Sequence, residues 1–299
     1  TSVALTSIGN TTTAALQSGG GLTGVQDLRI TADSRTAVTT TALGGANGTG
    51  VALAGAFAVT TSTDRTSALI GAGSAPLVAS GSVILEARHS IPVTTIARGL
   101  VTGGDAAIGI VVALSILDHA VRATPARDIP AGTSITIGAT GASSAVTTAE
   151  ATAGGAPGED SANPSQPTAS DTMESTRSFA EQAPGDAAAA VPATLPEPST
   201  PDGNVSVAAA IAITLHTSIA DASVDGVTLT APSVVIEASH HDRAESTATG
   251  QPADRGPPSG ALTIAAGIAI TVADTTIAAN AGSGTTIVAD ALTLRAGIA

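Results

Sequence analysis

The sequence predicts an all-β chain that folds as a repetitive parallel β-helix, or β-solenoid. The first observation is a repeat, because Val83-Ile84-Leu85-Glu86-Ala87-Arg88-His89 returns as Val234-Val235-Ile236-Glu237-Ala238-Ser239-His240. Weaker copies of this segment share one alanine. A fixed period of this kind is typical of stacked supersecondary units. The aligned alanines are Ala32, Ala87, Ala139, Ala238 and Ala296, with spacings of 55, 52, 99 and 58 residues.

The second observation is the near absence of aromatic residues. Phe57 and Phe179 are the two aromatic residues in 299, and Trp and Tyr do not occur. A globular core of this size usually depends on aromatic side chains, each of which buries roughly 150–250 Å². A core built from Val, Ile, Leu and Ala must be thin and repetitive, as it is between closely stacked strands.

The third observation is a period of two in the apolar runs. Residues 207–215 read V-A-A-A-I-A-I-T-L, and residues 264–272 read I-A-A-G-I-A-I-T-V. Alanine favours helices, but the alternation and the β-branched residues favour strands. We expect Ile, Val and Leu to point inward and small side chains to form the outer faces. The small residues expected outside are Ala52, Ala54, Ala56, Ala58, Ala208, Ala210 and Ala212.

Each repeat has a similar internal order, best seen in the second copy. Short runs bounded by Gly, Asp and Ser are read as strands and turns. In order, we expect a strand over Val51–Thr61, a polar corner at Ser62–Arg65, a short run Thr66–Ile70, a glycine loop at 71–73, a strand over Ser82–His89 and a short run Val93–Ala97. The period leaves open whether a repeat forms two short coils or one broad coil. Two coils per repeat would give a stack of roughly 50 Å.

The chain divides into three parts. Residues 1–149 hold three solenoid repeats, and residues 204–299 hold two more. Between them, residues 150–203 carry 9 of the 24 carboxylates, 8 of the 16 prolines and one basic residue, Arg177. Such a segment has too few apolar groups to offset the entropy of ordering. We therefore predict a long acidic loop that leaves the stack.

Charge and composition exclude several classes. The net charge is −13, and all 11 basic residues are arginines. Basic clusters and aromatic platforms for nucleic acid are missing, so we predict no nucleic-acid partner. The lack of cysteine rules out disulfides and cysteine-based sites, and no apolar run is long enough for a membrane span. Because Thr1 and Ala299 both fall partway through a repeat, we expect a segment of a longer exported protein.

The V-x-I/L-x-A strands and the apolar runs before them carry a resemblance to a known group. The strands are Leu28–Ala32, Val83–Ala87, Ile135–Ala139, Val234–Ala238 and Leu292–Ala296, and the best apolar run is Ala261–Ile270. This pattern resembles the long bacterial exported proteins built from β-strand repeats, namely filamentous-haemagglutinin-like adhesins and autotransporter passenger regions. The resemblance implies a secreted or surface-tethered parallel β-helix for adhesion or an extracellular layer. It carries over no functional residue.

The candidate metal ligands are His240-His241-Asp242, with Glu237 and Glu245 nearby. Imidazole and carboxylate groups suit several metals. However, neighbouring residues of a strand point to opposite faces, so His240 and His241 do not easily share an ion. His89 takes the place of His240 in its own repeat, which favours a structural role. We therefore predict no metal site and no cofactor.

Other motifs are interpreted as structural. The glycine-rich stretches 19–24 and 44–50 lack the lysine and the βαβ context of a phosphate loop. Gly103-Gly104-Asp105 and Asp225-Gly226 are fragments of calcium turns, without the full nonapeptide. Repeated carboxylates indicate turn chemistry rather than a glycosidase pair, so we predict no enzyme and no catalytic residue. These carboxylates are Asp64, Asp118, Asp221 and Asp274.

Threonines recur at one position of successive repeats. Thr40, Thr95 and Thr147 fall at equivalent places, which could indicate an ice-binding face, but Ser246 breaks the row in the fourth copy.

The leading hypothesis is a structural segment of a giant secreted or cell-surface protein, assembled by strand stacking and lateral self-association. Its partners would be copies of itself or neighbouring repeats. The alternative is an adhesin that binds a cell-surface receptor through residues 150–203.

Overall fold

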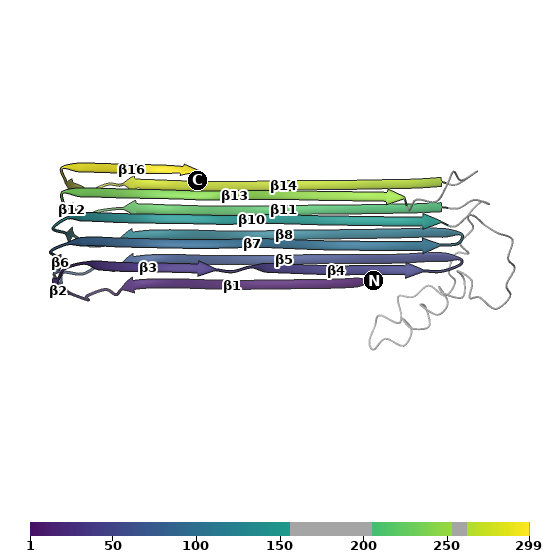
Figure 1. Ribbon diagram of the computed structural model, residues 1–299, viewed down its shortest axis with the longest axis horizontal. Coiled ribbons are helices and arrows are strands. Elements are labelled where there is room, and N and C mark those ends of the chain that lie inside the picture. Colours follow the sequence, from purple (N-terminus) through teal and green to yellow (C-terminus); the bar gives the residue numbers. More distant parts are fainter. Residues whose placement is uncertain (156–204, 253–261, 299) are drawn as a thin grey trace, which may run out of the picture.

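The computed structural model describes residues 1–155, 205–252 and 262–298, and every regular element in these ranges is a β-strand (Figure 1). The strands are β1 (Ser2–Leu16), β2 (Leu22–Val25), β3 (Leu28–Arg35), β4 (Val38–Asn47), β5 (Val51–Ile70), β6 (Leu77–Ala79), β7 (Ser82–Gly103), β8 (Ala106–Pro125), β9 (Ile129–Pro130), β10 (Ser134–Gly155), β11 (Val205–Val224), β12 (Thr228–Thr230), β13 (Ser233–Pro252), β14 (Leu262–Ala281), β15 (Thr286–Val288) and β16 (Ala291–Ile298).

Two long parallel sheets face each other. Sheet I has the order β1-β5-β8-β11-β14, and sheet II has the order β16-β13-β10-β7-β3, with β4 also paired to β7. Two small sheets, β15-β12-β9 and β2-β6, lie in the turns. Every pair is parallel and joins strands one repeat apart in the chain. The predicted parallel β-solenoid is therefore confirmed.

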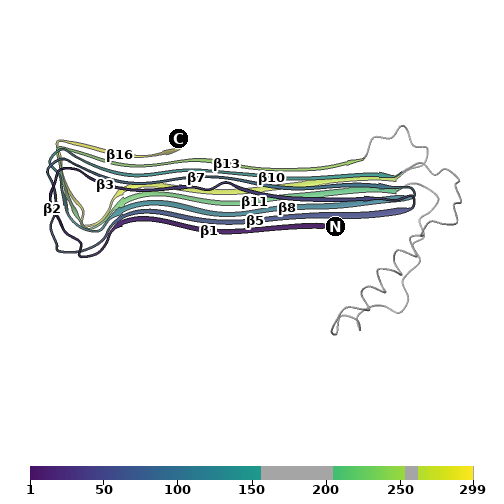
Figure 2. The ribbon, with the colours of Figure 1, turned by 60° about the horizontal axis from the view of Figure 1, so that its bottom comes forward.

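One broad coil makes each repeat. The chain runs along sheet I, turns through a short strand, returns along sheet II and then enters the next coil. A strand of 20 residues such as β5 spans about 66 Å, whereas five strands stack to only about 20–24 Å. The molecule is therefore longest along its strands (Figures 1 and 2), and the stack is shorter than two coils per repeat would give.

The repeat alignment is confirmed residue by residue. Ala32 pairs with Ala87, Ala87 with Ala139, Ala139 with Ala238, and Ala238 with Ala296. The five alanines thus form one row across sheet II, on its inner side. The spacing before Ala238 is longer because residues 156–204 lie between β10 and β11 in the chain. The register does not change, since Ala139 still pairs with Ala238.

The predicted breaks within each repeat are wrong. Strand β5 continues from Val51 to Ile70, straight through the expected corner at Ser62–Arg65. Strand β7 likewise runs from Ser82 to Gly103 without a break. The polar residues did not end these strands because their inward members find hydrogen-bond partners inside the stack, so the backbone has no reason to turn.

The interior has two halves that differ in side-chain size. At the end that holds the short strands, a bulky aliphatic core contains Ile70, Leu85, Ile137, Leu229 and Ile236. At the other end the core consists largely of alanine, together with Val101 and Val111. Polar side chains and a small cluster around Ile91 and Leu117 lie between the two halves.

The predicted facing of the alanine-rich strands is wrong. Every alanine that was expected outside is buried, and Leu53, Phe57 and Ile268 point outward instead. The reason is the distance between the sheets. A Cβ atom on Gly44 would lie 2.4 Å from the carbonyl oxygen of Gly55, and one on Gly250 would lie 2.5 Å from that of Ala266. Alanine and glycine fill most of the space between backbones so close, and the two inward valines, Val101 and Val111, lie against Gly109 and Gly99.

The connections at the two ends of the long strands differ in length in the second coil. Gly104 and Asp105 alone link β7 to β8, whereas the whole segment 71–81 links β5 to β7 at the other end. Figure 2 shows the wider turns gathered at one end of the long strands. Residues 156–203, nearly all of the predicted acidic loop, lie outside the described residues. Its first residues, 150–155, still belong to β10.

Candidate functional site

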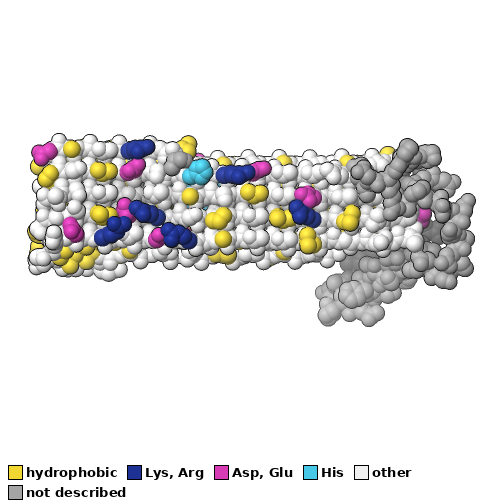
Figure 3. Space-filling view, in the orientation of Figure 1, with side chains coloured by type: hydrophobic (Ala, Val, Ile, Leu, Met, Phe, Trp, Pro, Cys, Tyr) yellow, Lys and Arg dark blue, Asp and Glu magenta, His cyan; other side chains and the backbone are white. Residues whose placement is uncertain are grey.

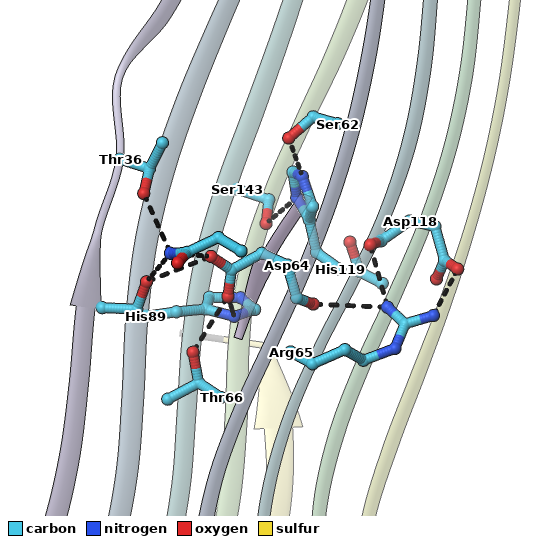
Figure 4. A network of polar contacts seen from close by, with 12 residues as sticks. Thr36, Ser62, Asp64, Arg65, Thr66, His89, Asp118, His119 and Ser143 are labelled. Atoms are coloured by element: carbon cyan, nitrogen blue, oxygen red, sulfur yellow. Dashed lines mark hydrogen bonds and ion pairs between the residues drawn. The ribbon is translucent and has the colours of Figure 1, made fainter. Parts of the chain in front are cut away.

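A belt of polar side chains crosses the interior between the two halves. We call it the polar belt, and Figure 4 shows part of it. It holds four of the five histidines of the chain, two aspartates and several hydroxyl groups, all from inward positions of both sheets. Its members are Asn10, Ser34, Ser62, Asp64, His89, His119, Ser143, His216, Ser218, His240 and Asp242.

Asp64 on β5 anchors one end of the polar belt. Its carboxylate accepts hydrogen bonds from Asn10 Nδ2 at 2.9 Å, Ser34 Oγ at 3.0 Å and Thr66 Oγ1 at 2.9 Å. A buried carboxylate is costly unless such donors replace its water. The next residue, Arg65, points to the outer face, where it pairs with Asp118 (Figure 4).

His119 on β8 is bonded at both ring nitrogens. Nδ1 lies 3.0 Å from Ser143 Oγ on sheet II, and Nε2 lies 3.2 Å from Ser62 Oγ on the neighbouring strand of sheet I. A neutral imidazole offers one donor and one acceptor, and a hydroxyl group can complement either. His119 is therefore satisfied without a charge, and it joins the two sheets.

His89 and His240 meet across an intervening coil. Both share a row with Gly141, which pairs with each of them in the sheet. A Cβ on Gly141 would lie 2.2 Å from His240 Cδ2 and 2.8 Å from His89 Nε2. The two imidazoles occupy the space that this glycine leaves, and their Nε2 atoms are 3.2 Å apart. One ring must donate its Nε2–H and the other ring must accept it, so one proton lies between the two Nε2 atoms.

Asp242 on β13 anchors the other end. Its Oδ1 lies 3.1 Å from His240 Nδ1 and 3.7 Å from His216 Nε2. Ser218 Oγ donates to the same oxygen at 3.0 Å and lies 2.9 Å from His216 Nε2. The polar belt is thus a chain of buried groups that runs from one carboxylate to the other through imidazoles and hydroxyls.

Burial keeps His89, His119 and His216 neutral. It lowers the pKa of His89 to about 4, assisted by His240, and lowers the pKa of His119 to about 3, assisted by His216 and His89. Burial also lowers the pKa of His216. For Asp242, burial alone raises the pKa, but His240 and the hydroxyl of Thr275 outweigh it and bring the pKa to about 2. The polar belt therefore combines these three neutral imidazoles with an ionised Asp242 at pH 7.

A second polar feature is a hydroxyl ladder beside the alanine core. Seven hydrogen bonds of 2.6–2.9 Å link eight hydroxyl groups that alternate between the two sheets from coil to coil. Each hydroxyl group can donate once and accept twice, which makes a continuous chain possible. The members are Thr40, Thr60, Thr95, Ser115, Thr147, Thr214, Ser246 and Thr271.

A single arginine joins the turns of three coils. Arg127, between β8 and β9, is 5% exposed. Its guanidinium donates to the carbonyl oxygens of Gly71 at 2.6 Å and Gln17 at 3.3 Å, and also to that of Gly20. These carbonyls belong to the two preceding coils. Arg127 thus links the turns of three coils through their backbone acceptors.

The outer face of sheet II is charged. Figure 3 shows basic and acidic side chains side by side on it. Arg29 and Arg88 both pair with Glu86, at 3.1 and 3.0 Å, and Arg98 pairs with Glu150 at 2.8 Å. Farther up the stack, Arg243 pairs with Glu245 at 2.6 Å and Arg295 with Glu237 at 3.4 Å. Such exposed pairs keep the face hydrated and add little stability.

The outer face of sheet I is different. Along the half of the strands over the alanine core it carries aliphatic side chains and no charge. The segments concerned are 2–9, 51–61, 106–116, 205–215 and 262–272. Its charged residues, such as Arg65 and Asp118, lie in the other half of the strands.

The structure separates the predicted metal-like cluster. His240 is buried and His241 is exposed on the opposite face, as the strand geometry required. Asp242 stays with His240, and the histidine that joins them is His216 from another strand. The sequence signal for His216 was its inward position in the alternating run Ala-Ile-Thr-Leu-His, residues 212–216. Among the described residues no group of three or more His, Asp or Glu side chains is arranged to hold a metal ion.

The structure also shows where the threonine row, the recurrent aspartates and the glycine-rich stretches lie. Thr40, Thr95 and Thr147 are buried in the hydroxyl ladder, so they form no ice-binding face, although Ser246 does continue their row. The recurrent aspartates are not turn residues, because all four lie inside strands of sheet I. Asp64 is buried, whereas Asp118 and Asp274 share an outward row. Of the glycine-rich stretches, 19–21 precede strand β2 and 48–50 connect β4 to β5, whereas 22–24 and 44–47 lie in strands; Gly19 and Gly24 have φ of 80° and 74°.

Comparisons with known proteins add no relative: no protein-family model, curated protein or solved structure matches this chain. The described part of the chain contains no helix with the length and apolar character needed to cross a membrane. His89, His119 and His240 are sealed from solvent, whereas Asp242 at one end of the polar belt is partly exposed.

Proposed function

We propose that this chain is a structural segment of a giant secreted or cell-surface bacterial protein, which forms a fibre, sheath or extracellular layer. Strand stacking along the solenoid and lateral self-association between solenoids would build the assembly. We further propose that it has no enzymatic activity. Its work would be to hold a long, flat surface in a fixed shape.

The observation that supports this proposal most is the continuous, in-register stack. Strand β10 pairs with β7 and β13 along its length, as β8 pairs with β5 and β11. The interior is filled by short aliphatic side chains and by hydrogen-bonded polar groups from successive coils. Such a body resists bending because each coil is bonded to its neighbours through its whole backbone. Rigidity of this kind suits a load-bearing or surface-covering role.

Electron microscopy and sedimentation of the purified chain test the proposal. We expect concentration-dependent assemblies with flat sides, and their persistence in chelator would agree with a metal-free mechanism. Particles that stay single up to millimolar concentration, in both low and physiological salt, would contradict a role in self-assembly.

The alternative is an adhesin that presents residues 150–203 to a receptor. Strands β10 and β11 flank that segment, and β10 ends and β11 begins at the end of the long strands that holds the alanine core (Figure 1). A rigid body that displays a loop at one end is a reasonable carrier for a recognition element. Deletion of residues 156–204 distinguishes the two: loss of cell binding with assembly intact favours the adhesin.

A further inference from the structure

The outer face of sheet I carries an apolar panel over the alanine core. We use this name for the outward residues of the five segments 2–9, 51–61, 106–116, 205–215 and 262–272. Leu53 is 64% exposed, Ile110 47%, Ile268 52% and Leu5 72%. Other exposed members are Val3, Phe57, Ile116, Leu215, Leu262, Ile264, Ile270 and Val272.

The apolar panel is ordered rather than a scatter of exposed residues. Strand register places Leu53, Ile108, Val207 and Ile264 in one row across the sheet. Two further rows follow at intervals of four and two residues along the strands. They are Val3, Phe57, Val112, Ile211 and Ile268, and then Leu5, Val59, Leu114, Ile213 and Ile270. The side chains form parallel ridges on a flat backbone.

The apolar panel follows from the narrow interior. Where the sheets approach closely, alanine and glycine fill most inward positions, so Leu, Ile and Phe of each alternating strand face outward. The same alternation that would bury Ile and Val in a wider solenoid exposes them here. Monomeric proteins rarely expose contiguous apolar patches of more than a few hundred square ångströms. A partner that covers the apolar panel is therefore expected.

Size and charge favour a second copy of the chain as that partner. Eleven residues along the strand and five strands across give a footprint of roughly 850 Å². Stable interfaces bury about 800 Å² on each partner. A charged partner gains nothing from a panel without charge. A second copy offers an equally flat face, and two β-sheets pack well through aliphatic side chains at about 10 Å.

Residues 156–204 of the same chain are a poor match for the apolar panel. Their sizeable apolar groups are few: Met173, Phe179, Val191 and Leu195. The segment is otherwise acidic and rich in proline, and burial of its carboxylates against aliphatic side chains would be costly.

We propose that the apolar panel of sheet I is the self-association surface, so that two copies pack face to face through it while the charged face of sheet II stays in water. This inference rests on the proposed function, which it sharpens by assigning the contact to one half of one sheet. The contact surface would therefore consist of rows of Leu, Ile and Val, and not of the outward alanines that the sequence predicted.

The test uses the full chain and one substitution at the centre of the apolar panel, Ile211→Asp. An unpaired carboxylate at a buried interface should weaken association by about 100-fold. The matched control is Thr148→Asp, on the outer face of sheet II, which should leave association unchanged. Ile211→Thr keeps a β-branched residue without charge and should weaken association less. Sedimentation equilibrium gives the dissociation constants, and circular dichroism shows that each variant is folded.

The outcomes separate the two proposals. If Ile211→Asp is folded and still associates as wild type does, the apolar panel is not the contact, although self-assembly stands. If wild type stays single at all concentrations, the self-association in the proposed function fails as well. A third arm uses neutral phosphatidylcholine vesicles: wild type that binds them and remains single would show that lipid covers the apolar panel, which would overturn the inference.

Discussion

The two halves of the solenoid interior are built from the same alternating strands but are packed in opposite ways. In the bulky aliphatic core, Leu85 and Ile137 point inward, and the outward row beside them holds Ile84, Thr136 and Val235. In the alanine core, Ala210 and Ala212 point inward, and Ile211 faces outward. What differs is the gap between the sheets: large side chains fill it in one half, whereas alanine and glycine fill most of it in the other.

This difference shows that a period of two determines that one face is buried, but not which one. The gap between the sheets makes that choice. A wide gap has to be filled by large side chains, because an empty interior loses dispersion contacts. A narrow gap excludes them. One strand can therefore change its inward residue type from isoleucine to alanine along its length, with the polar belt and the hydroxyl ladder between.

Truncation in the wide half should have the largest effect. We expect Leu85→Ala to lower the free energy of unfolding by about 2–5 kcal/mol, because Leu85 is fully buried and its loss leaves a cavity. Its neighbour Ile84 points outward, so Ile84→Ala should cost much less. Urea denaturation followed by circular dichroism measures both. Equal losses for the two variants would contradict the assigned facing.

Acid should act on the polar belt that separates the halves. The pKa values of His89 and His119 in the fold, about 4 and about 3, lie below the ordinary value of 6.5. Unfolding then takes up protons below pH 6.5, so stability is complete above that pH and falls as the pH drops toward 4 and 3. Each pKa unit corresponds to about 1.4 kcal/mol, and we expect a total loss of a few kcal/mol.

Urea titrations at pH 7, 5.5 and 4.5 measure this loss. His119→Gln keeps a side chain that hydrogen-bonds with Ser62 and Ser143 but does not titrate, and it should make the pH dependence shallower. A free energy of unfolding that does not change between pH 7 and pH 4.5 would show that the histidines are not held neutral by burial.

Enlargement in the narrow half gives the converse test. Ala210→Leu should cost about 1–3 kcal/mol or more, because the sheets have no room for the added carbons. Ala209 lies next to it on the outer face, so Ala209→Leu should be nearly neutral. Thermal unfolding of both variants measures the difference. A stable, well-folded Ala210→Leu protein would mean that the gap opens easily.

The hydroxyl ladder should show a smaller effect. Thr147→Val keeps the shape of the side chain but deprives Ser115 and Thr214 of a partner, and we expect a loss of about 1–2 kcal/mol. Thr148→Val, on the outer face, should change stability by less than about 0.5 kcal/mol. If both variants unfold at the same urea concentration, the ladder adds no stability of its own.

The sequence by itself determined the class of fold and the register. The row of five alanines could be read from repeat spacing, because coils that stack in register place equivalent residues beside each other. The opposite orientation of His240 and His241 also followed from strand geometry alone. Local patterns suffice for these features, since they depend on the backbone period and not on the partner sheet.

Only the tertiary structure decided what the sheets enclose. The facing of Ala210, the continuation of β5 through Asp64 and the meeting of His216 with Asp242 all depend on the opposite sheet. No local signal reports how wide the gap is, or that Gly141 leaves room for two imidazoles from other coils. A polar residue ends a strand when water is its best partner and continues it when a buried partner is available. That partner comes from a distant part of the chain, so the choice belongs to the assembled stack.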